Sequence, residues 1–289
     1  MNSFIKAHKH LFNFEKFIHL ALQEDTGDGD HTSLSTIPKH KKGKMRLLVK
    51  DDGIIAGVEA AKLIFKQVDP KLNVKIHIED GAKVKKGDVV FITEGHVHSL
   101  LIAERLVLNI MQRMSGIATK AHHLQKLCKG TNTKVIDTRK TTPNFRFFEK
   151  WAVVIGGGAN HRYGLFDMIL IKDNHIDFAG GIIEAIKAAN HYLKNTGRKL
   201  NIEVETRSIE DVKKVVAYGH VQRIMLDNFS PAQTKQAVKI INGAFEVESS
   251  GGITEHTIEA YAKAGVDFIS VGALTHHVKS MDLSLKAVK

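Results

Sequence analysis

The sequence predicts an α/β protein built on an incomplete, six-stranded α/β barrel that follows a region of mixed helices and strands. Short apolar runs recur between about residues 133 and 274: "KVIDT", "MILIK", "NIEVE", "RIMLD", "AFEVES" and "FISVGA". Amphipathic helix patterns separate the later runs, at 182–194, 209–218, 231–241 and 254–264. This alternation predicts parallel strands joined by crossover helices.

The ends of these runs favour a barrel, although an open doubly wound sheet would also fit the alternation. Each run finishes in or beside charged, hydroxyl or glycine residues: Thr138, Arg139 and Lys140; Lys172; Glu205; Asp227; Ser250, Gly251 and Gly252; Gly272. Parallel strands place all these ends on one face, and in barrels that face carries the active site. Six clear runs are too few for a complete barrel of eight strands, so we expect an incomplete one.

Residues 1–115 have a less regular pattern. Helices are predicted at 14–23 and 59–68, and a long one at about 99–128. The segment 44–57 is typical of a strand, a turn and a second strand, and 72–96 alternates in strand fashion around glycine turns. We therefore expect a separate N-terminal domain.

Composition indicates an ordinary globular protein. Of 289 residues, 43% are hydrophobic and 25% are charged. No window approaches the roughly 18 apolar residues of a membrane span, and the N-terminus lacks the apolar stretch of a secretory signal, so we expect a cytoplasmic protein. The lone Cys128 excludes an internal disulfide, and we expect it to pack in the interior.

The net charge of +11 and pI of 9.5 are compatible with nucleic acid, an anionic small molecule or simple solubility. Many lysines lie on predicted amphipathic helix faces, as in 209–218, where solvation explains them. No basic run is interleaved with aromatic residues, so a nucleic-acid partner is not favoured.

Three familiar motifs are excluded by spacing. The loop "EDTGDGDHTS" (24–33) lacks the final glutamate of a calcium loop and is interpreted as a helix end with a structured loop. "GGGANHR" (156–162) lacks the dinucleotide fingerprint and follows a helix-like segment. The pairs His122–His123 and His276–His277 are adjacent residues, which face different directions on a helix, so they do not predict a metal site.

The strand ends combine cations with two carboxylates. The cations are Arg139, Lys140, Arg162 and Lys172, and the carboxylates are Glu205 and Asp227. Uncompensated buried charge is costly, so the cluster implies a ligand of comparable charge or a metal ion. The triple glycine of 156–158 would end a helix and bring His161 and Arg162 into the site. His161 then either donates a hydrogen bond there or is a core histidine satisfied within the protein.

Two glycine-containing strand ends, "ESSGG" and "SVGA", predict a phosphate site. Gly251, Gly252 and Gly272 allow a backbone to approach an oxyanion closely, and Ser250 adds a hydroxyl. A phosphate site in the last two strand loops recurs in barrels.

The motifs "DTRKTTP", "EKWAVVIGGGANHR", "ILIKDNH", "IEVE", "MLDN", "ESSGG" and "SVGALTH" occur in that order. With "EDTGDGDHTS" and "AERLVLNIMQRMSGIAT", this set resembles the quinolinate phosphoribosyltransferase family, also called nicotinate-nucleotide pyrophosphorylase (carboxylating), over nearly the whole chain. Local departures are Asn144–Phe145, where the family more often has Gly-Leu, and Trp151, where it more often has Tyr.

The resemblance implies transfer of a phosphoribosyl group to quinolinate with decarboxylation, giving nicotinate mononucleotide, pyrophosphate and carbon dioxide in NAD biosynthesis. It implies magnesium as a cofactor and a homodimer, with higher oligomers left open. It also implies a sandwich-like α+β domain over 1–115, joined by the C-terminal segment 276–289, and a partial barrel over 116–275.

The resemblance also implies residue roles. The quinolinate site would comprise Arg105 from the partner subunit, Thr138, Arg139, His161, Arg162 and Lys172. Catalysis, and binding of the ribose, pyrophosphate and metal, would involve Lys140, Glu205 and Asp227, with the metal held by the two carboxylates, directly or indirectly. The ribose phosphate would contact Ser250, Gly251, Gly252, Val271, Gly272 and Ala273.

Two other functions stay open at this point. One is a related transferase that uses nicotinate or another aromatic acid, although a single carboxylate would not need three arginines. The other is a binder of anions or nucleic acid without catalysis, which would bind in a salt-dependent way and show no turnover.

Overall fold

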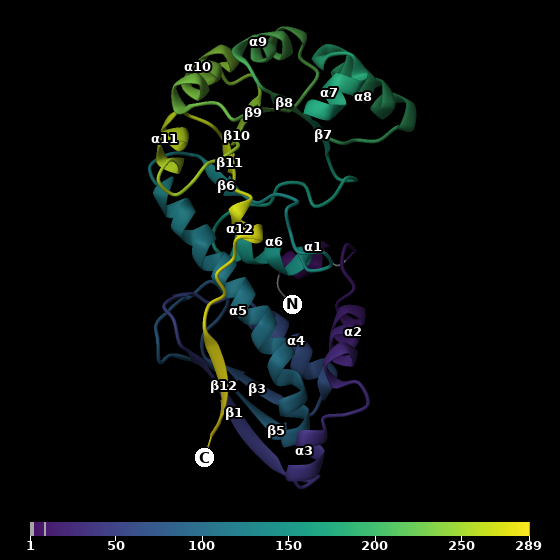
Figure 1. Ribbon diagram of the computed structural model, residues 1–289, viewed down its shortest axis with the longest axis vertical. Coiled ribbons are helices and arrows are strands. Elements are labelled where there is room, and N and C mark those ends of the chain that lie inside the picture. Colours follow the sequence, from purple (N-terminus) through teal and green to yellow (C-terminus); the bar gives the residue numbers. More distant parts are fainter. Residues whose placement is uncertain (1–2, 9, 289) are drawn as a thin grey trace. The chain divides into compact units, whose positions relative to one another are not determined.

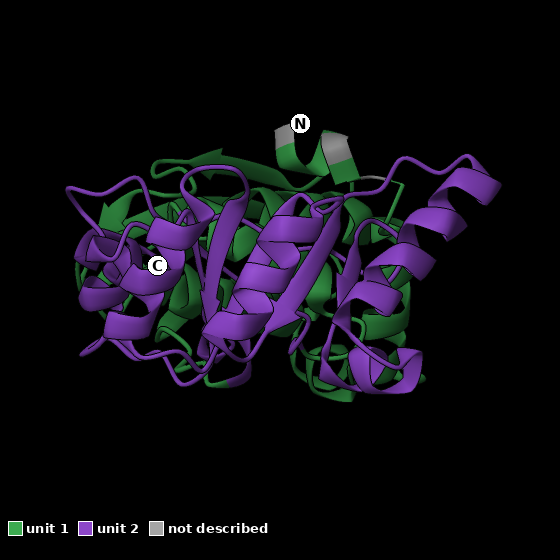
Figure 2. Cartoon of the chain, turned by 90° about the horizontal axis from the view of Figure 1, so that it is seen from above, with its two compact units in different colours: residues 1–120, 142–157, 277–289 green, residues 121–141, 158–276 purple. Residues whose placement is uncertain are grey.

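The computed structural model describes residues 3–8 and 10–288. The described residues fall into two compact units (Figure 2). Unit 1 comprises 1–120, 142–157 and 277–289, and unit 2 comprises 121–141 and 158–276. The segment 142–157, which the predicted domain 116–275 included, thus groups with the N-terminal part of the chain.

Unit 1 is a mixed α/β domain. Its sheet has the strand order β12-β1-β5-β3, all antiparallel, and β2 and β4 form a separate pair. The strands are β1 (Lys42–Val49), β2 (Gly53–Ile54), β3 (Asn73–Ile76), β4 (Lys83–Val84), β5 (Val89–His96) and β12 (Leu283–Ala287). The helices are α1 (Ser3–His8), α2 (Phe14–Thr26), α3 (His31–Thr36), α4 (Val58–Val68), α6 (Arg146–Ile155) and most of α5 (Val97–Leu127).

The core of unit 1 follows from the helix patterns. On α4, Ile64 and Phe65 are fully buried, and the Phe65 ring meets Phe91 of β5 edge to face at 5.8 Å. Gln112 of α5 accepts a hydrogen bond at its carbonyl from the Met281 backbone at 3.0 Å, and β12 pairs with β1. The C-terminal segment is therefore part of this unit.

The departures from the usual motif at 144–151 have structural explanations in unit 1. Asn144 has φ of 60°, in the left-handed region that asparagine tolerates better than most residues besides glycine. Phe145 contacts Phe148 at 4.8 Å between ring centroids, and Trp151 stacks on Phe4 at 5.9 Å. The bulkier side chains therefore extend an aromatic cluster.

Unit 2 contains a six-stranded, all-parallel sheet with the order β6-β11-β10-β9-β8-β7. The strands are β6 (Lys134–Ile136), β7 (Ile169–Ile171), β8 (Ile202–Thr206), β9 (Arg223–Asp227), β10 (Glu246–Ser250) and β11 (Phe268–Ser270). The helices are α7 (Asp173–Ala179), α8 (Ile182–Thr196), α9 (Ile209–Tyr218), α10 (Pro231–Ile241), α11 (Ile258–Lys263) and α12 (Ala273–His276).

The strands form an inner arc and the crossover helices α8 to α11 an outer arc (Figure 1). The first strand, β6, pairs with the last, β11, as in a barrel, but among the described residues β6 and β7 do not pair with each other. The predicted incomplete barrel is confirmed, and it is open between its first and second strands.

Local capping explains where several of these helices begin. Ser208 accepts a hydrogen bond from the Asp211 backbone at the start of α9, and Ser230 forms a capping box with Gln233 at the start of α10. The helix predicted over 254–264 is shorter than expected, because Thr254 to Thr257 form a turn in which the Thr254 N–H donates to Thr257 Oγ1. No helix in the described part of the chain has the length and apolarity needed to span a membrane.

Candidate active site

The carboxyl ends of the unit 2 strands surround one cavity of about 770 Å³, within the usual range for small-molecule sites. Most of the predicted site residues line it: Thr138, Arg139, Lys140, His161, Arg162, Lys172, Asp227, Ser250, Gly251, Gly252, Val271, Gly272 and Ala273. Glu205 and Arg105 are not among the lining residues. Arg105 lies on α5 in unit 1, where it is exposed.

Positive charge is concentrated in this cavity. Arg139, Lys140, Arg162 and Lys172 all line it. Burial, and then the neighbouring charge of Arg139, lower the pKa of Arg162. Among the described residues, Arg162 Nε is buried without a hydrogen-bond partner. Buried donors are usually satisfied, so the cavity is suited to a ligand that brings anionic acceptors.

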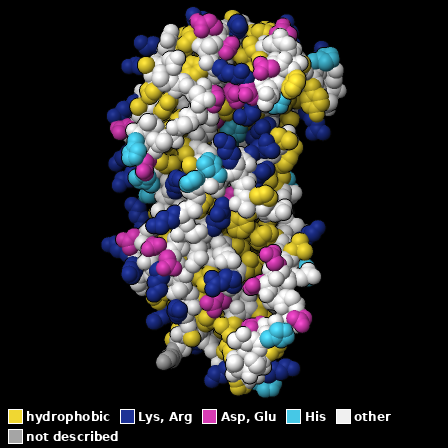
Figure 3. Space-filling view, viewed as in Figure 1, with side chains coloured by type: hydrophobic (Ala, Val, Ile, Leu, Met, Phe, Trp, Pro, Cys, Tyr) yellow, Lys and Arg dark blue, Asp and Glu magenta, His cyan; other side chains and the backbone are white. Residues whose placement is uncertain are grey.

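On the face shown in Figure 3, by contrast, lysine and arginine side chains are interspersed with acidic and uncharged ones. This distribution agrees with the interpretation that solvation explains much of the net charge of +11.

Asp137, at the end of β6, holds the loop that carries His161 and Arg162. The Asp137 side chain is fully buried, and its Oδ1 accepts the His161 backbone N–H at 3.0 Å. Ala159 forms an isolated parallel bridge with Ile136 of β6. Helix α6 ends at Ile155, before the triple glycine, as predicted. The loop beyond it therefore runs beside the strand that leads into Thr138 and Arg139.

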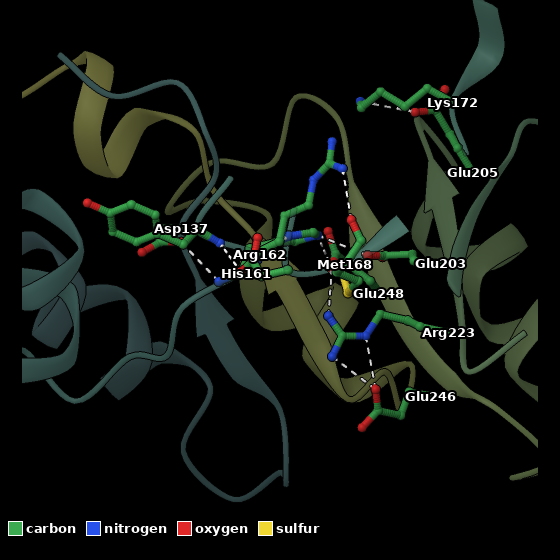
Figure 4. A network of polar contacts seen from close by, with 12 residues as sticks. Asp137, His161, Arg162, Met168, Lys172, Glu203, Glu205, Arg223, Glu246 and Glu248 are labelled. Carbon is green, nitrogen blue, oxygen red and sulfur yellow. Dashed lines mark hydrogen bonds and ion pairs between the residues drawn. The ribbon is translucent and has the colours of Figure 1, made fainter. Parts of the chain in front are cut away.

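Buried carboxylates lie behind His161, and the sequence analysis missed them (Figure 4). His161 Nε2 lies 3.0 Å from Glu203 Oε2 on β8 and 3.4 Å from Glu248 Oε2 on β10. Both glutamates are fully buried. A glutamate inside a buried parallel strand, as in "NIEVE", is the signal that could have revealed them, because charged residues are rarely buried without a partner.

The protonation of this cluster has opposing causes. Burial disfavours the imidazolium of His161, but hydrogen bonds to Glu203 and Glu248 outweigh it and raise the pKa of His161 to about 9. Burial and the charge of Glu248 raise the pKa of Glu203 to about 7. The Arg162 backbone N–H lies 2.7 Å from His161 Nδ1, and it can donate there only when the ring is neutral with its proton on Nε2, so this contact opposes the effect of the carboxylates. In either state Nε2 carries a proton directed at the carboxylates.

Arg223 is the second cation of the buried cluster. Its Nη1 lies 3.4 Å from Glu248 Oε2, and its Nη2 lies 2.9 Å from Glu246 Oε2. The ligand atoms of His161, Glu203 and Glu248 lie within 4.8 Å of one another, as metal ligands do. However, the Nε2–H of His161 and the guanidinium of Arg223 already face these carboxylates, so the cluster is satisfied without a metal ion.

The two predicted catalytic carboxylates have different surroundings. Asp227 lines the cavity, and its Oδ2 accepts a hydrogen bond from Asn228 Nδ2 at 2.7 Å. Glu205 is 5% exposed, and its Oε2 lies 3.2 Å from Lys172 Nζ. Oxygen ligands suit magnesium, and Asp227 is the one of the two that faces the cavity.

Glycines after β10 and β11 bring the backbone close to the cavity. Gly251 has φ of +93°, and an added Cβ would lie 2.2 Å from Asn228 Oδ1. A Cβ on Gly272 would lie 3.1 Å from Lys140 Cδ and 3.2 Å from the His276 ring. His276 itself lines the cavity, a role that its sequence position next to His277 did not indicate. Close backbone approach of this kind suits a phosphate.

Fold and site together define an α/β protein with a cavity lined by cations and glycine loops at the carboxyl ends of parallel strands. The chain matches the family "Quinolinate phosphoribosyl transferase, C-terminal domain" over residues 117–286 and its N-terminal domain counterpart over residues 30–115. The chain therefore belongs to the quinolinate phosphoribosyltransferase family.

Individual relatives agree with this assignment. The chain is 46% identical to the chloroplastic nicotinate-nucleotide pyrophosphorylase (carboxylating) of Arabidopsis thaliana, over 95% of this chain and 83% of the relative. It is 40% identical to the probable nicotinate-nucleotide pyrophosphorylase (carboxylating) of Bacillus subtilis, over 94% and 92%. The crystal structure of NadC from Streptococcus pyogenes is similar, with a TM-score of 0.90, 37% identity, and coverage of 96% of this chain and 97% of that one.

Proposed function

We propose that this chain transfers the phosphoribosyl group of phosphoribosyl pyrophosphate to quinolinate with decarboxylation. The products are nicotinate mononucleotide, pyrophosphate and carbon dioxide. One observation supports this most strongly: Arg139, Arg162 and Lys172 line the same cavity as the glycine loops at 250–252 and 271–273. A doubly acidic ring and a phosphorylated sugar would thus be held side by side.

The cations would bind the two adjacent carboxylates of quinolinate. Guanidinium groups match planar carboxylates with paired hydrogen bonds, and Arg139 and Arg162 both line the cavity. In this proposal Arg105 of a second subunit adds a third guanidinium, so the active form is a homodimer. Thr138 lies at the same strand end and would contact the ring.

Lys140, Asp227 and Glu205 would act on phosphoribosyl pyrophosphate. As pyrophosphate leaves, negative charge grows on it, and a preorganised donor such as Lys140 is typically worth about 3 kcal/mol in the transition state. Asp227, and Glu205 directly or indirectly, would hold magnesium together with the phosphates of the substrate. When bound, magnesium supplies positive charge that neutralises the leaving group.

Chemistry at the pyridine ring needs no dedicated base. The pyridine nitrogen attacks the anomeric carbon as pyrophosphate leaves, and the nitrogen becomes positive. That charge stabilises the carbanion left when carbon dioxide departs from the neighbouring carbon, and the carbanion then takes up a proton from water. Ribosyl transfer therefore precedes decarboxylation in this proposal. Detection of nicotinate without an attached ribose as an intermediate on the enzyme would contradict that order.

The proposal is tested by release of carbon dioxide from carboxyl-labelled quinolinate in the presence of phosphoribosyl pyrophosphate and magnesium. We expect stoichiometric carbon dioxide and nicotinate mononucleotide, and neither product with Arg139→Ala. Turnover of nicotinate in place of quinolinate would favour the related transferase. Binding of DNA or RNA without turnover of either acid would favour the non-catalytic alternative.

The cellular location stays a prediction. A cytoplasmic enzyme is expected from the sequence, and the name of the Arabidopsis thaliana relative places that protein in the chloroplast. Fractionation of the source cells would decide it.

A further inference from the structure

We propose that the buried carboxylates Glu203 and Glu248 are positioning residues that hold His161 and, through it, orient Arg162 toward quinolinate. This inference rests on the proposed function, because it assigns a purpose to groups that the reaction does not otherwise use. It also gives His161 an indirect role, in place of direct binding to the substrate.

The carboxylates come from rigid positions in the sheet. Glu203 lies on β8 and Glu248 on β10, and β9 lies between these strands. His161 Nε2 reaches both carboxylates, at 3.0 and 3.4 Å, and the ring side chain is 6% exposed. The imidazole therefore connects two strands that flank a third, β9 (Figure 4).

The other ring nitrogen continues the connection to Arg162. In the neutral ring His161 Nδ1 accepts the Arg162 backbone N–H at 2.7 Å, and Asp137 accepts the backbone N–H of His161 itself. Both ring nitrogens are thus engaged within the chain, and the geometry leaves the ring edge, not a nitrogen, for the cavity. A shift of the ring would move the backbone from which the Arg162 side chain starts.

The side chain of Arg162 depends on that starting point. Its Nη1 donates to the Met168 carbonyl at 3.2 Å, and its Nε finds no hydrogen-bond partner among residues 3–8 and 10–288. A guanidinium fixed at its backbone and at one nitrogen has few rotamers left, so it meets a carboxylate with little further ordering. Loss of the contact between the Arg162 backbone and His161 would therefore misplace the Nε donor of Arg162.

Charge provides a second reason for the carboxylates. Arg162 is close enough to Arg139 for the two guanidinium groups to repel each other, as the lowered pKa of Arg162 reflects after the effect of burial. Glu203 attracts Arg162 from behind the cavity wall. Glu203 thus offsets part of the repulsion between Arg162 and Arg139.

The test compares Glu203→Gln with Glu246→Gln. Glu246 pairs with Arg223, as Glu248 does, but it lies half exposed and is not among the glutamates at His161 in the described residues, so it serves as the control. We expect Glu203→Gln to raise the KM for quinolinate about tenfold while the KM for phosphoribosyl pyrophosphate changes less than about twofold. Glu246→Gln should change neither. An equal rise in the KM for both substrates, or no change in the KM for quinolinate, would overturn the proposal.

A double-mutant cycle with Arg162→Gln identifies the route. If Glu203 acts through Arg162, the double variant has about the same KM for quinolinate as Arg162→Gln alone. If the rises in KM caused by the two single substitutions multiply in the double variant, Glu203 acts independently of Arg162. The inference then fails, while the proposed function stands. If Arg162→Gln leaves the KM for quinolinate unchanged, the proposed role of Arg162 fails as well. Should Glu203→Gln not fold, the same cycle with Glu248→Gln gives the same two outcomes.

Discussion

Lys172 Nζ lies 3.2 Å from Glu205 Oε2, which joins a cation that lines the cavity to a buried carboxylate that does not. The lysine side chain is 47% exposed and the glutamate side chain 6%. This pairing holds the ammonium beside the cavity, where a carboxylate of quinolinate is proposed to bind.

Lys172→Ala should therefore impair quinolinate use selectively. A hydrogen bond to a charged group contributes about 1.5–3 kcal/mol, so we expect the KM for quinolinate to rise by about 10- to 100-fold. Steady-state kinetics with each substrate varied in turn would measure this. Lys213→Ala, on an exposed face of α9, is the matched control and should leave the kinetics unchanged. Wild-type kinetics in Lys172→Ala would contradict the assignment.

The proposed contribution of Arg105 from a second subunit predicts recovery of activity in mixed dimers. At quinolinate concentrations below the wild-type KM, Arg105→Ala and Lys172→Ala should each retain little activity alone. After random exchange of equal amounts, half of the dimers are mixed and each has one intact site, so about a quarter of wild-type activity should return. Exchange would be verified with two affinity tags. Continued inactivity of a purified mixed dimer would exclude a shared site.

Gly251→Ala should weaken both the fold and the use of phosphoribosyl pyrophosphate. Gly251 has φ of +93°, and a Cβ there would collide with Asn228, which hydrogen-bonds Asp227. A residue held in this region typically costs about 1–3 kcal/mol. Denaturant unfolding and the KM for phosphoribosyl pyrophosphate would measure the two effects.

Gly243→Ala separates backbone strain from crowding. Gly243 has φ of +74° but open space around a Cβ, and it does not line the cavity. Gly243→Ala should lower the free energy of unfolding through backbone strain alone and leave the kinetics unchanged. A normal KM in Gly251→Ala would show that this loop does not bind the substrate.

Cys128 should be unreactive in the folded protein. It is 1% exposed, and burial raises the pKa of its thiol to about 11. At pH 8 about one thiol in a thousand would be ionised, and the thiolate is the reactive form. A disulfide reagent such as DTNB should label the protein stoichiometrically in guanidinium chloride and very slowly without it. Rapid labelling of the native protein would contradict the burial of this residue.

Much of unit 2 was predictable because its elements are regular. Strands β8 and β9 and helices α9 and α10 lie where hydrophobic periodicity placed them. Short helices such as α3 and α7 were not predicted, because helices of one or two turns have little stability of their own and form through contacts elsewhere in the fold.

The site was predictable where chemistry sits at a strand end. Arg139, Lys172 and Asp227 could be assigned to one face because parallel strands point the same way, and all three line the cavity. Glu203 could not be assigned a partner, since strand alternation says which side a residue faces but not what lies there. Its pairing with His161 depends on how a loop from another part of the chain is folded against β8.

The order of residues was thus sufficient to specify the strands, their common direction and the cationic character of their ends, because these depend on local periodicity and on side-chain chemistry. Which distant groups meet was settled by folding: the opening of the sheet between β6 and β7, the pairing of Lys172 with Glu205, and the buried carboxylates behind His161. Such contacts depend on three-dimensional packing, in which residues far apart in the chain satisfy each other's charges and hydrogen bonds away from water.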